Sequence, residues 1–351
     1  MNVNELNAIV KITSRFSNRS SLSTLYRSLE LSDTTLRLQS DWGNIEMSIP
    51  PTGIKSPSLI DAVALGTLST YPPEAEIEFT EKDNKIYYRI GRARGCWDLV
   101  SCDHKIQKLK HDVFPWAPPE HFADALRVAS SACEAAAVSA GLYGIVIDPK
   151  FGKLNIMSSN RTALAAATID GKDYPVEHAV TLRPPIPKLI ALILDSFRDC
   201  MMDVSEKGVY IRGDGIKAFL PFAAGLEQDL GHVADKFQSH TTEIQVDSIA
   251  IKKFITRARA LTDRKVSFTV GIKIEKGQLI LQHRGIASEM EEEFIAEGAS
   301  EDINYNSISY SADMLLEPLE YVQSIVLDYL PNQQLVLRGK DPEFIFVVGG
   351  D

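Results

Sequence analysis

The side chains that could carry out chemistry in this chain of 351 residues are, first, its cysteines and histidines. A cysteine nucleophile needs a histidine base beside it, and a structural metal needs cysteines or histidines at short, fixed spacing. The four cysteines, Cys96, Cys102, Cys133 and Cys200, are scattered and include no C-x-x-C pair. The seven histidines include no H-E-x-x-H pattern. We therefore expect no Cys–His catalysis, no bound metal and no cofactor.

A second candidate for chemistry is the acidic segment Glu289–Glu293, which holds four glutamates in five residues. Carboxylates can hold a metal ion for hydrolysis, but no histidine or aspartate accompanies this cluster at a fixed spacing. We interpret the segment as a solvated acidic loop, with a hydrolase as the disfavoured alternative.

Glycine-rich segments are the third candidate, because backbone N–H groups in such loops can bind phosphates. Gly91–Gly95 and Arg212–Gly215 both lie between strand-like patterns, so we interpret them as hairpin turns. The sequence contains no G-x-x-x-x-G-K-[ST] motif and no G-x-S-x-G motif. Nothing in these three groups indicates an enzyme.

Basic side chains gather at residues 249–265, where six lysines and arginines accompany one acid, for a local net charge of +5. With about 100° between successive residues of a helix, one arc of this segment is apolar and the bases lie opposite to it. A solvated helix face is the ordinary interpretation. Similar bases on equivalent helices favour instead a shared surface that binds phosphates without reading sequence. The arc that we expect to be buried comprises Ile251, Phe254, Ile255, Ala258 and Leu261.

The elements that must position these residues form a unit that occurs three times. Each unit opens with an amphipathic helix, at 3–12, 120–129 and 247–256, and continues with a pair of strands joined by a turn. A second helix follows, at 56–63, 184–193 and 311–319, and then two more strands. This order predicts an α+β fold with antiparallel sheets and helices on one face. The proline-rich 114–119 and the polar 228–242 separate three predicted domains, 1–115, 116–240 and 241–351.

The composition, 44% hydrophobic and 24% charged, is that of a globular protein. No apolar run approaches the roughly 20 residues that a membrane span needs, and the first residues do not form a signal peptide. We therefore expect no membrane partner, a cytoplasmic location and reduced cysteines. A net charge of −10 ordinarily argues against a nucleic-acid partner, but residues 289–302 alone hold seven acids and no base, so charge is segregated by element.

Along essentially the whole chain, these units resemble the bacterial sliding clamp, the β subunit of DNA polymerase III, as a divergent member of that family. The middle unit is similar to the clamp's helix, its "L-x-G-v-x-[IVF]" strand and its "A-T-D-G-x-R-L-A" segment; the next segment is similar to "v-i-[LV]-P-x-K-x-l-x-E-l". The third unit matches the acidic "eaeEe" strand and "i-x-F-N-x-x-Y-l". The individual motifs are degenerate, and their order and spacing across three units carry the resemblance. The matching residues are His121–Ala129, Leu142–Asp148, Leu154–Ala165, Ala179–Ile190, Glu289–Phe294 and Ile303–Tyr310.

The resemblance implies a head-to-tail homodimer whose six domains form a ring around double-stranded DNA. It also implies a polymerase processivity factor without catalytic activity, which binds DNA polymerase and the clamp loader through short peptides. A clamp-fold interaction scaffold or regulator that no longer encircles DNA is the alternative. The bases that would face DNA are Lys11, Arg15, Arg19, Arg127, Lys188, Arg198, Lys252, Lys253, Arg257, Arg259 and Arg264.

The sequence departs from the clamp pattern where clamps hold partner peptides. In the segment similar to "A-T-D-G-x-R-L-A", Arg161 replaces the glycine and Ala163 the arginine. No F-P-D-Y motif occurs near Glu227, and Phe346–Asp351 replaces a "V-M-P-M-R"-like tail. The resemblance thus predicts the fold more firmly than the usual partners. The implied pocket comprises Ser159, Arg161, Thr162, Leu164, Val347 and Val348.

The resemblance also places the joint of the ring between the first domain of one chain and the third domain of its twin. Leu261, at the end of the apolar arc, occupies the position of an interface residue. Trp97, within the edge-strand pattern Gly95–Leu99, is its expected counterpart. The alternative for both side chains is a place in the core of their own domain.

Overall fold

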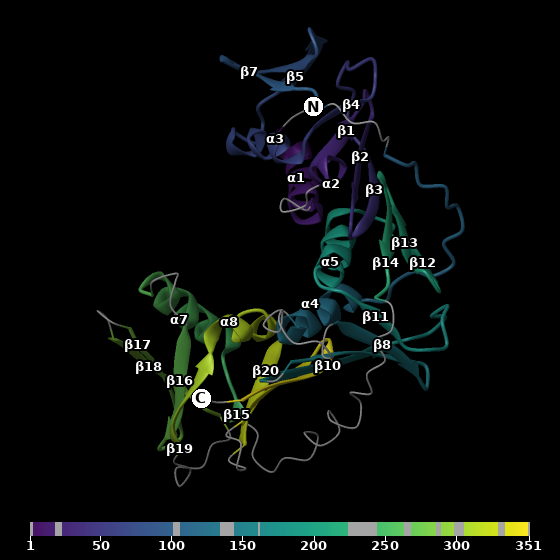
Figure 1. The fold of residues 1–351 in the computed structure, drawn as a ribbon. Helices are drawn as coiled ribbons and strands as arrows, with labels where there is room; N and C mark the ends of the chain where they lie inside the picture. Colours follow the sequence, from purple (N-terminus) through teal and green to yellow (C-terminus); the bar gives the residue numbers. More distant parts are fainter. Residues whose placement is uncertain are drawn as a thin grey trace. The chain divides into compact units, whose positions relative to one another are not determined.

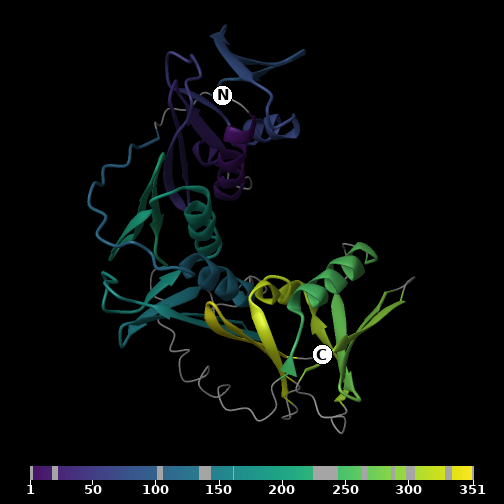
Figure 2. The ribbon, with the colours of Figure 1, turned by 180° about the vertical axis from the view of Figure 1, so that it is seen from behind.

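The computed structural model describes residues 3–17, 23–100, 106–133, 144–160, 162–223, 244–262, 268–285, 289–297, 305–328 and 334–349. Contacts between residues divide the chain into two compact units. Unit 1 comprises Met1–Pro118, Asp173–Val176 and Lys188–Phe222, and unit 2 comprises Pro119–Lys172, Glu177–Pro187 and Ala223–Asp351. Both units combine helices with antiparallel sheets (Figures 1 and 2).

Unit 1 is built on a seven-stranded sheet in the order β12-β13-β14-β3-β2-β1-β4, with a separate three-stranded sheet β5-β6-β7. Helix α1 buries the apolar side of its 3.6-residue period, including Leu6, Ile9 and Phe16. Its elements are α1 (Val3–Phe16), α2 (Thr24–Arg27), β1 (Ser28–Leu31), β2 (Thr35–Ser40), β3 (Gly43–Ser48), β4 (Ser58–Asp61), α3 (Ala62–Gly66), η1 (Leu68–Thr70), β5 (Ile77–Lys82), β6 (Lys85–Ile90), β7 (Ala93–Asp98), most of α5 (Ile186–Ser196), β12 (Met201–Ser205), β13 (Gly208–Gly213) and β14 (Ile216–Pro221).

Unit 2 contains an eight-stranded sheet in the order β11-β8-β9-β10-β22-β21-β20-β15 and a four-stranded sheet β18-β17-β16-β19. Helix α4 packs on β9 and β10, and α7 contacts β17 and η4. Its elements are α4 (Phe122–Cys133), β8 (Ile145–Lys150), β9 (Lys153–Ser159), β10 (Ala163–Asp170), β11 (Val180–Leu182), β15 (Ile244–Gln245), α7 (Ser248–Ala260), β16 (Thr269–Glu275), β17 (Gln278–Arg284), β18 (Glu289–Ile295), β19 (Tyr305–Ser311), α8 (Ala312–Leu315), η4 (Pro318–Glu320), β20 (Val322–Asp328), β21 (Gln334–Lys340) and β22 (Glu343–Gly349).

The predicted α+β class with antiparallel sheets is confirmed, and two segments differ from their predicted type. The second helix predicted at 56–63 begins only at Ala62, because residues 58–61 pair with β1 as β4. Asp61 then caps the short helix by accepting a hydrogen bond from the Val63 N–H. The acidic loop predicted at 289–293 is wrong, since these residues form β18 and pair with β17. The repeats also contain more strands than the two pairs predicted for each, among them β3, β7, β11, β12 and β22.

Strands from different predicted domains share sheets. In unit 1, β14 pairs with β3, so that Lys217 lies opposite Glu46. In unit 2, β10 pairs with β22, so that Leu164 lies opposite Val347. These two ladders explain why contacts group the described residues into two units. The limits at 115 and 240 remain a prediction.

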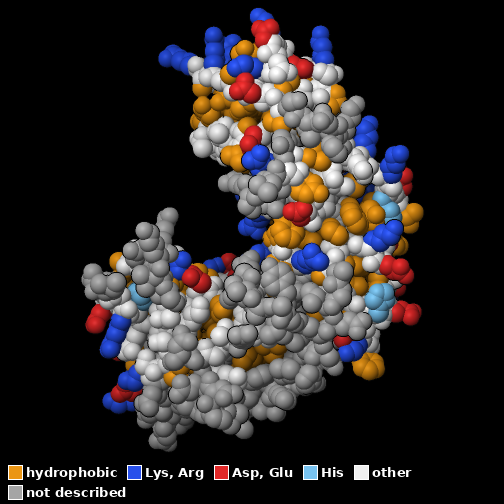
Figure 3. Space-filling model, viewed as in Figure 1, with side chains coloured by type: hydrophobic (Ala, Val, Ile, Leu, Met, Phe, Trp, Pro, Cys, Tyr) orange, Lys and Arg blue, Asp and Glu red, His pale blue; other side chains and the backbone are white. Residues whose placement is uncertain are grey.

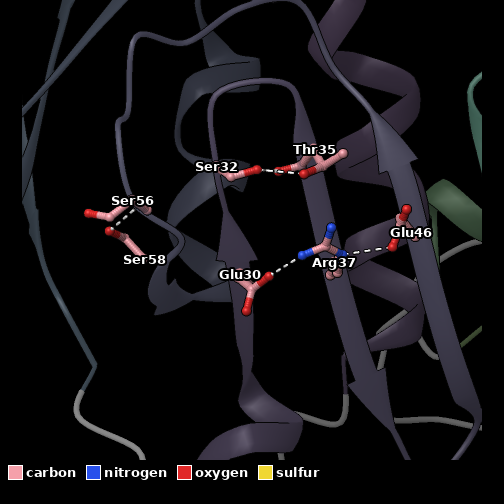
Figure 4. Close-up of polar contacts among 7 residues, drawn as sticks. All are labelled: Glu30, Ser32, Thr35, Arg37, Glu46, Ser56 and Ser58. Atoms are coloured by element: carbon pink, nitrogen blue, oxygen red, sulfur yellow. Dashed lines mark hydrogen bonds and ion pairs between the residues drawn. The ribbon is translucent and has the colours of Figure 1, made fainter. Parts of the chain in front are cut away.

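A row of charged side chains crosses the seven-stranded sheet on neighbouring strands β1, β2 and β3. Arg37 lies between Glu30 and Glu46 and donates to both carboxylates, at 2.6 Å and 2.7 Å (Figure 4). The Arg37 and Glu30 side chains are only 11% and 10% exposed, and that of Glu46 is 26% exposed. Burial works to lower the pKa of Arg37, but the hydrogen bonds to Glu46 and Glu30 outweigh it and raise that pKa. The two glutamates therefore stabilise the charged form of Arg37.

Candidate nucleic-acid and partner surfaces

Helix α7 has the two faces that its sequence predicts. Asp247 caps its first turn by accepting from the Ala250 N–H, and Ile251, Phe254 and Ala258 are buried against the unit. Four bases on its remaining surface, Lys252, Lys253, Arg257 and Arg259, are half-buried or exposed.

Three of these four bases form ion pairs with acids from other elements of unit 2. Lys252 pairs with Glu320 of η4, and Arg257 pairs with Glu292 of β18. Arg259 pairs with Asp313 of α8 at 2.7 Å, and its guanidinium lies 5.3 Å from the centre of the Phe268 ring. Lys253 forms no ion pair with any of the described residues. The local charge of +5 counted along the sequence is thus offset by acids that are distant in sequence.

The other predicted DNA-facing bases differ in how they are held. Lys11 and Arg15 are exposed on α1, Arg198 is exposed after α5, and none of the three forms an ion pair within the described ranges. Lys188 is half-buried in α5. Arg19 and Arg264 lie outside the described residues.

Arg127 of α4 belongs to a polar cluster that also includes Asp124 and Tyr321. Its guanidinium donates to the Asp124 carboxylate at 2.6 Å, and the Tyr321 hydroxyl donates to the same oxygen at 2.8 Å. Burial and the bond to Asp124 raise the pKa of Tyr321 to about 12, so its hydroxyl stays protonated at neutral pH. Only 20% of the Arg127 side chain is exposed, which leaves little of its charge open to a phosphate.

The predicted peptide-pocket residues are divided between two faces of the eight-stranded sheet. Leu164 and Val347 pair across β10 and β22 and form a buried cluster with Val326 and Val336, each at most 5% exposed. Val348 is buried too, but strand alternation places it on the opposite face from Val347. Ser159 is half-buried, Thr162 is exposed, and Arg161 lies outside the described residues.

The turn beside this cluster is organised by Asn160, which the sequence prediction did not single out. Its Oδ1 accepts from the backbone N–H groups of Thr162 and Ala163, at 2.8 Å and 2.7 Å. Its Nδ2 donates to the Ala132 carbonyl at 2.6 Å and so ties the turn to the end of α4. Asparagine often bonds to the backbone of a turn in this way, which is the signal that could have identified it.

Trp97 lies on β7, which forms one edge of the three-stranded sheet. Its half-buried indole packs on Tyr88, at 5.0 Å between ring centres, and on Phe79, at 5.8 Å. On the other face of this sheet, Arg89 and Arg94 lie opposite each other and are exposed. Figure 3 shows lysine and arginine side chains projecting around this sheet.

Leu261 is 52% exposed, so its predicted place in the buried arc is wrong. The helix ends at Ala260, and Thr262 instead contacts the sheet, with its hydroxyl 3.0 Å from His283 Nε2. His283 lies opposite Met290 of β18, the edge strand of the four-stranded sheet. Leu261 is therefore an exposed apolar side chain, and its neighbour in sequence, Thr262, contacts the four-stranded sheet.

The outward side of β18 carries the exposed residues Glu289, Glu291 and Glu293. The other side carries Phe294, whose ring lies 6.5 Å from that of Phe254 in α7.

Among the described residues, no group of three or more acids, cysteines or histidines could hold a metal ion. No helix within the described ranges is long and apolar enough to cross a membrane.

No protein-family model matches the sequence, and no curated protein matches it. Solved structures do. The DNA polymerase β subunit of Streptococcus pyogenes is 16% identical with a TM-score of 0.65, over 100% of this chain and 98% of that one. The Helicobacter pylori β clamp bound to a DNA ligase peptide is 15% identical with a TM-score of 0.67, over 100% and 99% of the two chains. The DNA polymerase sliding clamp of Caulobacter crescentus is 14% identical with a TM-score of 0.63, over 99% and 98%. From its first described helix to its last strand, this chain has the fold of the bacterial β sliding clamps.

Proposed function

We propose that this protein is a DNA sliding clamp, a non-catalytic processivity factor that encircles duplex DNA and tethers a replicative polymerase. The observation that carries the proposal is the likeness of the fold to sliding clamps, which extends over 100% of this chain. In this proposal two copies join head to tail, and the bases of α1 and α7 face the DNA. Contacts to phosphates alone suit such a surface, because a clamp must hold every sequence equally.

The proposed joint brings β7 of one copy beside β18 of the other. Both are edge strands, and pairing them would satisfy backbone groups that an exposed edge leaves open. The two edges carry exposed side chains of opposite charge. At the β7 edge these are Arg92 and Arg94, and at the β18 edge they are Glu291 and Glu293. A head-to-tail contact of unlike surfaces closes into a ring when its rotation allows closure.

Topological binding separates this function from its alternative, a clamp-fold scaffold that does not encircle DNA. We expect the protein to thread onto linear duplex through a free end and then to resist a high-salt wash once both ends are blocked. Cutting the blocked DNA should release it, because only a ring is held by intact ends. A protein that salt removes equally from blocked and open DNA would be a scaffold, and a particle image without a central hole would agree with that result.

Reversing the charge of the α7 surface should weaken retention on DNA. Lys253→Glu with Arg257→Glu replaces two exposed cations by anions, so fewer phosphates are neutralised and the salt dependence of retention becomes shallower. The measurement is the amount bound to an open-ended linear duplex across a salt series. Dimerisation and melting temperature should stay at the parent's values, and retention equal to the parent's would show that this surface does not meet DNA.

Peptides that bind other clamps should bind this one weakly. Leu164 and Val347 lie in a closed apolar cluster, Val348 faces away from it, and the polar residues of the clamp motif are altered. We expect a dissociation constant above about 100 μM, which corresponds to less than ~5.5 kcal/mol of binding free energy. Calorimetric titration with such a peptide measures it directly. A dissociation constant in the low micromolar range would mean that the altered motif still forms a working pocket.

A further inference from the structure

The three acids paired with α7 come from three separate elements of unit 2. Glu292 belongs to β18, Asp313 to α8 and Glu320 to η4, so no local sequence pattern produces the pairing. All three side chains are 37% to 53% exposed, so they lie on the surface beside the bases and not beneath them. A phosphate approaching α7 therefore meets carboxylates as well as cations.

An ion pair at hydrogen-bond distance presents little net charge to a third group. The Debye length is about 8 Å at physiological salt, so an acid in contact with a base cancels most of the field that a phosphate would sense. Such a pair releases fewer condensed counterions from DNA than a lone lysine or arginine does.

The bases of α1 lack this arrangement. Lys11 and Arg15 are exposed and form no ion pair within the residues described, like Lys253 on α7. Pairing is thus a feature of particular bases and not of every basic helix in the chain.

We propose that Glu292, Asp313 and Glu320 attenuate the contact between α7 and DNA. The proposal rests on the proposed clamp function, because it needs α7 to face DNA. The three acids act through Arg257, Arg259 and Lys252 and touch no phosphate themselves.

The test neutralises the three acids without changing their shapes, as Glu292→Gln, Asp313→Asn and Glu320→Gln. The measurement is equilibrium binding to an open-ended linear duplex over a salt series. Three unmasked bases should steepen the slope of log K against log salt by up to about 2.7, at about 0.9 for each phosphate contact. Between 50 and 200 mM salt, the variant should then lose about 40-fold more affinity than the parent loses, and it should bind more tightly at the low end.

A control variant carries the same change in net charge at three ion pairs elsewhere, as Asp83→Asn, Asp112→Asn and Asp148→Asn. Its salt slope should match the parent's. If the parent binds DNA and the triple variant binds with the same slope, or if the control steepens equally, the attenuation is overturned while the clamp function stands. If neither the parent nor the variant binds duplex at any salt, the clamp function itself fails, and the inference fails with it.

Discussion

Replacing Leu261 by lysine should convert the proposed dimer into a folded monomer. The side chain is half exposed at the end of α7, so a lysine there costs the isolated chain little. Buried in the proposed joint, the leucine would act as an apolar anchor, and such anchors typically cost 2 kcal/mol or more when truncated. A lysine costs more than truncation, because its charge would be buried without a partner.

Light scattering at micromolar concentration gives the mass of this variant, and its melting temperature shows whether it is folded. Ile249→Lys is a matched control, because Ile249 is 64% exposed at the other end of the same helix and should leave the dimer intact. A Leu261→Lys protein that stays dimeric would place the joint elsewhere. A variant that unfolds would mean that Leu261 contributes to the core of its own domain.

Removing Arg37 should destabilise unit 1 by about 3–5 kcal/mol, because Arg37→Ala leaves two partly buried carboxylates facing each other without a cation. All three tryptophans, Trp42, Trp97 and Trp116, belong to unit 1, so their fluorescence during urea denaturation reports the unfolding of that unit. We expect the midpoint to fall while the slope with urea stays unchanged.

Two further variants distinguish a buried triad from an ordinary ion pair. Lys85→Ala breaks the exposed pair with Asp98 and should cost far less stability than Arg37→Ala, because solvent screens an exposed pair. The combination Glu30→Leu, Arg37→Met and Glu46→Met removes every charge of the triad together and should recover most of the lost stability. An Arg37→Ala variant no less stable than Lys85→Ala would show that the triad contributes little.

Elements with their own periodicity were predictable from the sequence. The stripe at Ile251, Phe254 and Ala258 defined α7, and the alternating residues of β16 and β17 defined a hairpin, because each pattern is set by neighbours along the chain. Residues 58–61 were mistaken for helix because their conformation is decided by β1, which needs a partner strand along its edge. Long-range pairing overrode local preference there.

For the candidate surfaces, the sequence predicted which residues take part, but not which other side chains contact them or how buried they are. The bases of α7 could be placed on one face, but Glu320 and Asp313 lie more than 50 positions away in sequence, and only the fold brings them to Lys252 and Arg259. Leu261 satisfied the apolar period yet lies outside the core, because a period cannot reveal that the helix ends one residue earlier. Val347 and Val348 are alike as residues, and strand alternation alone separates them.

The two shared ladders also bear on how a clamp of this kind could open. Asn44 to Met47 of β3 lie against Ile216 to Phe219 of β14, and β10 runs along β22 from Ala163 to Thr168. Parting either pair of strands would break several backbone hydrogen bonds at once and expose two new sheet edges. Parting either ladder would also leave a ring of two such chains closed, because the peptide chain still runs across both internal junctions. Such a ring can therefore open only where the two copies meet.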